Sequence, residues 1–427
     1  MSIESKTEKL GIDLIFPDDS AYRKIAGERF MQMGFPDIHQ EDWRFTNLKP
    51  YLSGFDHFNP LPVVSDTFTD EDKALFNTSS PEAYFIVLHN TRLDRTHSEL
   101  PDGVVIEPYQ YSEAEIEGTS EEVRERSLFQ ANVALHSGGI IIRIKENISL
   151  DKPIHVIHHF SVDTPHFAFP RHRIIVERNA IASVIESVHF SKSMGNVFEI
   201  CHTSISIAEN ATFQHFSLQN RMTAHKVINQ IYATQAEGST YSNFTFSLSE
   251  ADLIRNNLDV YSHGPQTHTD MYGLNFTVGD QLVDNHTAMH HLQPDCTSNE
   301  LYRGVLRDTS KGVFNGKVFV HRLAQRTNAF QKNNNMLLSD KAIVFAKPQL
   351  EIFADDVRCS HGCTIGQFDD QAMFYLQSRG IGYDLAKNLL VEAFAFDITS
   401  RISIIPLKNY LNKLIHDRML VSAELDN

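Results

Sequence analysis

A regular turn rhythm is the feature of this 427-residue chain that most restricts its fold. From about residue 133 to 366, short runs rich in Val, Ile, Thr, Phe and Tyr alternate with polar turns, which is typical of strands. Turn sites that carry Gly, Asn or Asp recur at a nearly constant spacing, at Asn179, Asn210, Gly238, Asp280, Asp308 and Asp340. A period of about 30 residues predicts the stacked rungs of a β-helix, or solenoid, with a meander of hairpins in a sandwich or barrel as the alternative. The longer interval between Gly238 and Asp280 is either an insertion or a miscounted turn.

The chain divides into four regions by residue composition and hydrophobic pattern. We expect an N-terminal helical and mixed region over 1–106, an acidic linker or helix over 107–132, the β core over 133–366 and a C-terminal helical region over 367–427. Ser20 is expected to cap a helix that runs to Met33. The C-terminal helices are amphipathic, so they either dock on the core or present a face to a partner.

Composition excludes several classes of protein. The formal net charge is −16, from 38 Lys and Arg against 54 Asp and Glu, which argues against a general nucleic-acid or anionic-membrane binder. Four cysteines do not make a disulfide framework. We see no secretory signal and no apolar stretch of about 18 residues, so a cytoplasmic protein with free thiols is expected.

Common catalytic motifs are missing from the sequence. It has no GxxxxGK[ST] phosphate loop, no GxSxG elbow and no HExxH pair, so ATP hydrolysis by this chain is not expected. The chain has 22 histidines, and the densest groups are HVIHH and HTAMHH, residues 155–159 and 286–291. Histidines four residues apart on one strand lie about 13 Å apart, too far to share a metal ion. We therefore interpret these groups as structural.

One short segment concentrates side chains of the ligand type. RCSHGCTIG, residues 358–366, contains Cys359, His361 and Cys363. Thiolate and imidazole are preferred ligands of iron, zinc and Fe–S clusters. In a strand, Cys359 and His361 share a face at about 7 Å between Cα atoms, and Gly362 permits a bend after them. The three groups do not complete a tetrahedral shell, so they are either part of a site or buried thiols beside a turn histidine.

The same segment carries a family resemblance. PQLEIFADDVRCSHGCTIGQFD (348–369), followed by FYLQSRGI, resembles the C-terminal signature of the SufB/SufD family of Fe–S cluster assembly proteins. EDWRFTNL (41–48), LFQANVALHSGGIIIRI (128–144), DKPIHVIHH (151–159) and NNNMLLSDKA (333–342) resemble further family motifs. The CSHG sequence and the chain length are closer to the SufD branch than to the SufB branch, where an EHEA-type sequence is usual. Cys363 departs from the pattern of that branch, in which alanine is common.

The resemblance implies a mainly β fold, a right-handed parallel β-helix flanked by helical regions. It also implies a scaffold without ATPase activity that pairs with SufB through the β-helix and binds the SufC ATPase through the C-terminal helices. A transient Fe–S cluster would form at the SufB–SufD interface, and reduced flavin would be associated with the complex, although we find no flavin fingerprint.

Site residues follow from the same resemblance. His361 matches a family histidine implicated in cluster assembly at the SufB interface, Cys359 matches the neighbouring family cysteine, and Cys363 is a further candidate ligand. The expected SufC-docking residues of the C-terminal helices are Tyr383, Ala386, Leu390 and Phe394. The alternatives are a SufB-like homodimeric scaffold that holds a cluster unaided, and a carbohydrate-active solenoid enzyme.

Overall fold

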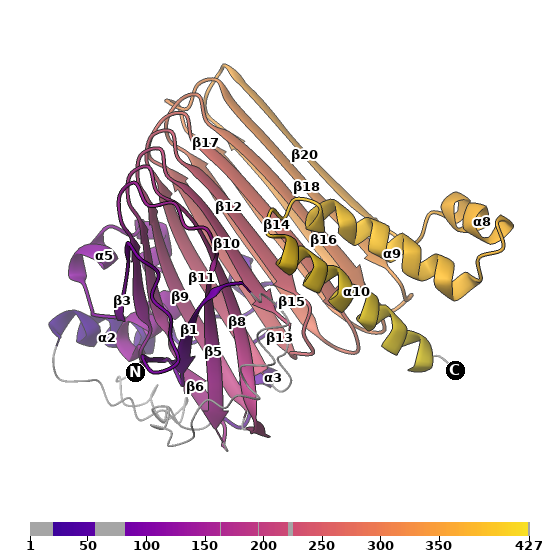
Figure 1. Ribbon diagram of the computed structural model, residues 1–427, viewed down its shortest axis with the longest axis horizontal. Coiled ribbons are helices and arrows are strands. Elements are labelled where there is room, and N and C mark those ends of the chain that lie inside the picture. The colour runs from indigo at the N-terminus through magenta and orange to yellow at the C-terminus, as the bar shows by residue number, and fades with distance from the viewer. Residues whose placement is uncertain (1–19, 56–81, 163, 195, 221–224, 426–427) are drawn as a thin grey trace.

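The computed structural model describes residues 20–55, 82–162, 164–194, 196–220 and 225–425. These residues form a parallel β-solenoid of about seven turns with helices toward both ends of the chain (Figure 1). Parallel pairing between successive rungs confirms the predicted solenoid and excludes the meander of hairpins. The segment before Ser20, in which no secretory signal was expected, lies outside the described residues.

The solenoid is built from two sheets, and each rung contributes a strand to both. Sheet A contains β2 (Arg92–Asp94), β1 (Tyr84–His89), β5 (Ile154–Val162), β8 (Ile181–Met194), β10 (Thr212–Gln219), β12 (Thr240–Ser247), β14 (His268–Thr277), β16 (Thr297–Leu306), β18 (Thr327–Leu337) and β20 (Val357–Gly366). Sheet B contains β3 (Val104–Pro108), β4 (Ile140–Ile144), β7 (Arg171–Val176), β9 (Val197–Ile207), β11 (His225–Gln235), β13 (Leu253–Ser262), β15 (Leu282–His291), β17 (Lys311–Val320) and β19 (Ile343–Ile352), with β6 (His166–Ala168) paired to β9.

One row of turns explains the sequence rhythm. Each passage from sheet B to sheet A between β4 and β18 contains one residue with positive φ, at Asn147, Asn179, Asn210, Gly238, Gln266, Asp295 and Arg326. The backbone N–H of each of these residues donates to a carbonyl of the next rung, as from Asn179 to Glu209 and from Asn210 to Glu237. Asp280, Asp308 and Asp340 lie at the opposite corner, where sheet A passes to sheet B. The long interval between Gly238 and Asp280 is therefore a miscount that switched corners, because the next turn in the first row is Gln266.

The interior of the solenoid is packed with side chains from both sheets. Alternate residues point inward, and the apolar ones form one continuous cluster that includes Phe213, Tyr241 and Met271 from sheet A and Met289 and Phe314 from sheet B. Because the strands pair in parallel and in register, each inward side chain lies directly above its counterpart one rung earlier. The interior therefore consists of files of stacked side chains.

Helices cover the outer faces of the sheets. The N-terminal elements α2 (Ala21–Met33), η1 (Glu41–Trp43), α3 (Lys49–Leu52) and α7 (Ser127–Leu135) lie against sheet B, where Phe30, Leu48 and Leu128 pack on Phe198 and Ile228. Ser20 caps α2 as predicted, because its side chain accepts a hydrogen bond from the Arg23 N–H. The C-terminal elements are α8 (Asp370–Ser378), α9 (Tyr383–Thr399) and α10 (Ile405–Leu425). Of these, α9 and α10 cover sheet A (Figure 1).

The acidic stretch is built into the structure. It forms α5 (Glu113–Glu117) and α6 (Glu121–Arg124) before α7. Glu115 is buried, and its carboxylate lies 3.2 Å from the guanidinium of the buried Arg171 and accepts hydrogen bonds from Tyr109 and Ser204. One carboxylate of this stretch thus anchors it to the core, while most of its neighbours are solvated.

The two ends of the solenoid differ. At the N-terminal end, the antiparallel pairs β1–β2 and β3–β4 complete the sheets. At the C-terminal end, β19 and β20 are the last strands of their sheets, and no further strand of the described residues pairs with them. Most residues of β20 are exposed. We call this final rung, β19 and β20, the open end.

The stacked turn row predicts a specific dependence on Asn210. Its φ of 57° is tolerated by Asn and Gly but costs a β-branched residue roughly 1–2 kcal/mol. We expect Asn210→Val to lower the free energy of unfolding by about that amount in urea, followed by circular dichroism. Asn210→Gly should have a much smaller effect, and an equal loss in both variants would contradict the role of the left-handed backbone.

Candidate functional site

Three ligand-type side chains line the open end. Cys359, His361 and Cys363 alternate along β20, and they pair in register with Ala329, Gln331 and Asn333 of β18, which are buried in the interior. The three therefore continue interior files onto the last rung and face the mouth of the solenoid. Cys359 packs on the interior apolar cluster, whereas His361 and Cys363 are exposed. The strand continues through Gly362 to Gly366, so the bend that Gly362 permits does not form.

Both thiols of the open end favour the protonated form. Burial raises the pKa of Cys359 and of Cys363 above the ordinary value. The Cys363 thiol donates a weak hydrogen bond to Asn333 Oδ1, at 3.8 Å from Sγ. Coordination to a metal would displace these protons, because the thiolate is the form that binds metals.

The three groups do not converge within this chain. Among the described residues, no three His, Cys, Asp or Glu side chains are arranged to hold a metal ion. Their spacing along an extended strand, about 7 Å for every second residue, accounts for this in β20. A metal site built on β20 would therefore need ligands from outside the described residues.

The four predicted docking residues of α9 differ in their exposure. Ala386 is fully buried, and Leu390 and Phe394 are partly buried. Phe394 faces sheet A, where the Arg303 guanidinium lies 4.4 Å from its ring centroid. Only Tyr383, at 55%, is well exposed. The opposite side of α9 is also apolar, with Leu385, Leu389 and Phe396 exposed. Of the four predicted residues only Phe394 packs on the apolar cluster at sheet A, and the other α9 members of that cluster are Val391, Ala395 and Ile398.

A buried polar cluster inside the solenoid escaped the sequence analysis. Glu186 of β8 lies 3.7 Å from His158 of β5 and 3.2 Å from His215 of β10, and Cys201 lines a small cavity of about 30 Å³ together with His158 and Glu186. Burial alone would raise the pKa of Glu186, but its interactions with the two neighbouring histidines outweigh burial and hold that pKa well below its usual range. The sequence does carry a trace of this cluster, because His158, Glu186 and His215 are each separated by about the length of one rung. Histidines compared along one strand could not reveal contacts between strands.

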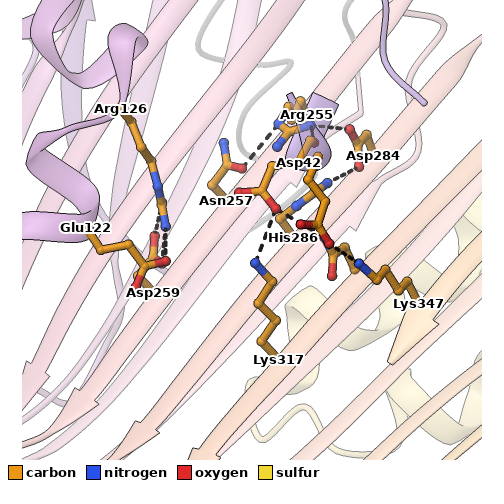
Figure 2. Close-up of polar contacts among 12 residues, drawn as sticks. Asp42, Glu122, Arg126, Arg255, Asn257, Asp259, Asp284, His286, Lys317 and Lys347 are labelled. Carbon is orange, nitrogen blue, oxygen red and sulfur yellow. Dashed lines mark hydrogen bonds and ion pairs between the residues drawn. The ribbon is translucent and has the colours of Figure 1, made fainter. Parts of the chain in front are cut away.

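The EDWRF segment is fixed on sheet B by a network of ion pairs (Figure 2). The buried Arg255 guanidinium lies 3.8 Å from the Trp43 ring centroid and 2.5 Å from Asp284. Asp42 pairs with Lys317 at 3.2 Å. A cavity of about 320 Å³ lies beside this network. Each cation faces a carboxylate of the same chain, so the network attaches the N-terminal region to the solenoid.

Comparison with known proteins assigns the family. The family model of the SUF system FeS cluster assembly SufBD core domain matches residues 159–394, which is more than half of the chain. The chain belongs to the SufBD family. A SufD protein of Escherichia coli is 28% identical over 406 residues, covering 92% of this chain and 91% of its own length. A SufBD family protein of Synechocystis is 28% identical over 412 residues, covering 93% and 90%. SufD of Bacillus subtilis is 24% identical over 394 residues, covering 88% of both chains.

The resemblance identified from the motifs is therefore confirmed, and this SufD-like chain acts in Fe–S cluster assembly in the SUF system. Family membership leaves the carbohydrate-active enzyme without support. None of the helices in the described part of the chain is both long and apolar enough to cross a membrane.

Trp43 is the only tryptophan, so its fluorescence reports how the N-terminal segment is attached. Arg255→Met removes the cation from the indole ring and leaves Asp284 buried without its guanidinium partner. We expect a loss of about 3–5 kcal/mol in the free energy of unfolding and a red shift of the Trp43 emission. Lys347→Met removes only the exposed pair with Glu41 and should leave the emission unchanged. Unchanged emission in Arg255→Met would contradict this attachment.

Proposed function

We propose that this chain is the SufD subunit of a SufB–SufC–SufD complex, a scaffold without ATPase activity on which Fe–S clusters are assembled. The observation that carries the proposal is the open end, where β20 bears Cys359, His361 and Cys363 and pairs with β18 but with no strand of the described residues on its outer edge. The cluster is cargo of the complex, and any reduced flavin belongs to the assembled complex rather than to this chain.

The open end supports pairing with a second solenoid. An unpaired edge strand exposes a row of backbone N–H and C=O groups that readily pair with another strand. Apolar side chains surround this edge, since Ile343, Ile352, Phe353 and Ile365 are between 42% and 58% exposed. A SufB solenoid seated here would satisfy the backbone groups and remove the apolar surface from water.

The same surface supports a shared cluster site. Cys359, His361 and Cys363 supply soft and borderline ligands that suit iron and sulfide, but they cannot surround a cluster alone. Ligands from SufB would complete the shell, and the interface would shelter the cluster from water. We assign His361 and Cys359 to this site, with Cys363 as a further ligand.

A separate apolar surface supports binding of SufC. Phe374 and Tyr375 of α8 are 73% and 57% exposed, and Leu385 of α9 is 56% exposed. Helix α8 extends away from the solenoid (Figure 1). We assign this surface, together with Tyr383, to the SufC ATPase, whose movements would reach the solenoid through the contact of α9 with β14 and β16.

A SufB-like homodimer is the second candidate, because two open ends of the same chain could also pair. Reconstitution of the isolated chain with iron and sulfide separates the two. A stable cluster in stoichiometric amount would favour the homodimer, whereas the SufD assignment predicts little cluster without SufB.

The His361 imidazole gives the first test of the cluster site. In cells that co-express SufB and SufC, we expect His361→Ala to leave the purified complex intact and to lower Fe–S cluster yield about tenfold or more, because a ligand-type side chain is lost. The exposed His39→Ala is the matched control and should retain full yield. A normal cluster yield in His361→Ala would remove this residue from the site.

A charged residue introduced on the proposed SufC-binding surface tests that surface. Leu385→Lys should abolish co-purification of SufC while SufB is retained, because a lysine would be desolvated in an apolar interface. Leu100→Lys, at a residue that is 53% exposed far along the chain, should have no effect. Retention of SufC by Leu385→Lys would place its binding site elsewhere.

A further inference from the structure

A buried carboxyl group lies two rungs below His361. Glu300 of β16 is 3% exposed and faces the interior. It belongs to the same file as His361, because Glu300 pairs in register with Gln331 of β18, and Gln331 pairs with His361 of β20. Thr287 of β15 donates to Glu300 Oε1 at 2.6 Å, and the Gln331 side-chain N–H donates to Oε2 at 2.8 Å. Burial raises the pKa of Glu300 to about 7, although these two hydrogen bonds act in the opposite direction.

Packing alone does not require a polar group at this position. One rung earlier, the same file contains Met271, which is fully buried in the apolar cluster. Burial of a carboxyl group without a cation is unfavourable compared with an apolar side chain of similar size. The Glu300 hydrogen bonds therefore point to a task that a methionine could not perform.

The opposite strand is shaped to admit the Gln331 amide. Gly316 of β17 lies across the interior, and a Cβ atom at this position would be 2.2 Å from Gln331 Nε2. Any larger residue would displace the amide from Glu300. The glycine and the carboxyl group together hold the Gln331 side chain in one orientation.

This orientation leaves one acceptor unused. Gln331 is 1% exposed, and its Oε1 has no hydrogen-bond partner among the described residues. The amide nitrogen is committed to Glu300 on one side of β18, and His361 occupies the same file on the other side. Neighbouring strands lie about 4.8 Å apart, so the side chains of residues paired in register on β18 and β20 are neighbours in the file.

We propose that Gln331 is a positioning residue for His361, with its side-chain oxygen accepting one imidazole N–H while Glu300 fixes the amide. The remaining ring nitrogen then carries a lone pair that faces out of the open end. Histidines that bind metals generally donate their second ring N–H to a carbonyl or carboxylate in this way, which fixes the tautomer and the ring orientation. The inference rests on the proposed role of His361 and adds the residues that orient it.

The test compares two identical substitutions in the full-length chain. Gln331→Met removes the proposed acceptor. Gln219→Met is the matched control, because Gln219 is also buried and hydrogen-bonded, to Ser247 and Asn256, but lies in β10, several rungs from His361. With ¹⁵N-labelled histidine, the ring N–H signal of His361 is assigned as the one missing in His361→Gln, and its exchange with water is measured.

We expect the His361 ring N–H to exchange at least about tenfold faster in Gln331→Met than in the wild type or in Gln219→Met. Glu300→Met, which copies the Met271 rung, is expected to accelerate exchange as well, because the amide is no longer fixed. Fast exchange in the wild type, or unchanged exchange in both variants, would overturn the contact.

A second readout links the contact to assembly. Gln331→Met should lower Fe–S cluster yield in cells by about tenfold or more while SufB and SufC still co-purify, whereas Gln219→Met should not. If His361→Ala retained full yield, the proposed function of the open end would fail, yet the exchange measurement would still decide the Gln331 contact. A protected N–H with unchanged yield in Gln331→Met would overturn the positioning role.

Discussion

Parallel, in-register pairing between rungs is the constraint on which the rest of the structure depends. It places each inward side chain directly above its counterpart one rung earlier, and the turn row from Asn147 to Arg326 keeps that register where sheet B passes to sheet A. The register also leaves the last rung with an edge, because nothing in the described chain continues the ladders beyond β19 and β20. Stability of the body and availability of the open end thus have the same origin.

The position of the candidate site follows from this stacking. Cys359, His361 and Cys363 occupy inward positions on a rung that no further rung of the described residues covers. Inward positions on earlier rungs are buried, whereas here they lie at the open end of the solenoid. The helices leave this mouth uncovered, since the N-terminal elements pack on sheet B and α9 and α10 pack on sheet A. The cluster site and the SufC surface are therefore separate parts of one chain, connected through the contact of α9 with sheet A.

The sequence predicted the elements better than their contacts. Turn residues with positive φ have a local chemical signature, as at Asn179 and Asn210, so the rung length and the solenoid could be inferred. The alternation of Cys359 and His361 likewise follows from strand geometry alone. The Glu186 cluster and the Glu300–Gln331 pair could not be inferred, because they depend on register between strands that are a whole rung apart. Which apolar residues of α9 lie exposed could not be inferred, because apolar residues on several sides of one helix do not reveal which of them are buried.

Hydrogen–deuterium exchange provides the most direct measurement of the central claim, that the open end is the surface on which SufB pairs. The amides of 343–352 and 357–366 that point away from β17 and β18 should exchange quickly in the isolated chain and become strongly protected in the purified complex, because pairing with a further strand engages their N–H groups. The interior strands β11 and β13 should be protected in both states. Unchanged exchange in β19 and β20, with new protection confined to the N-terminal end of the solenoid, would contradict the account.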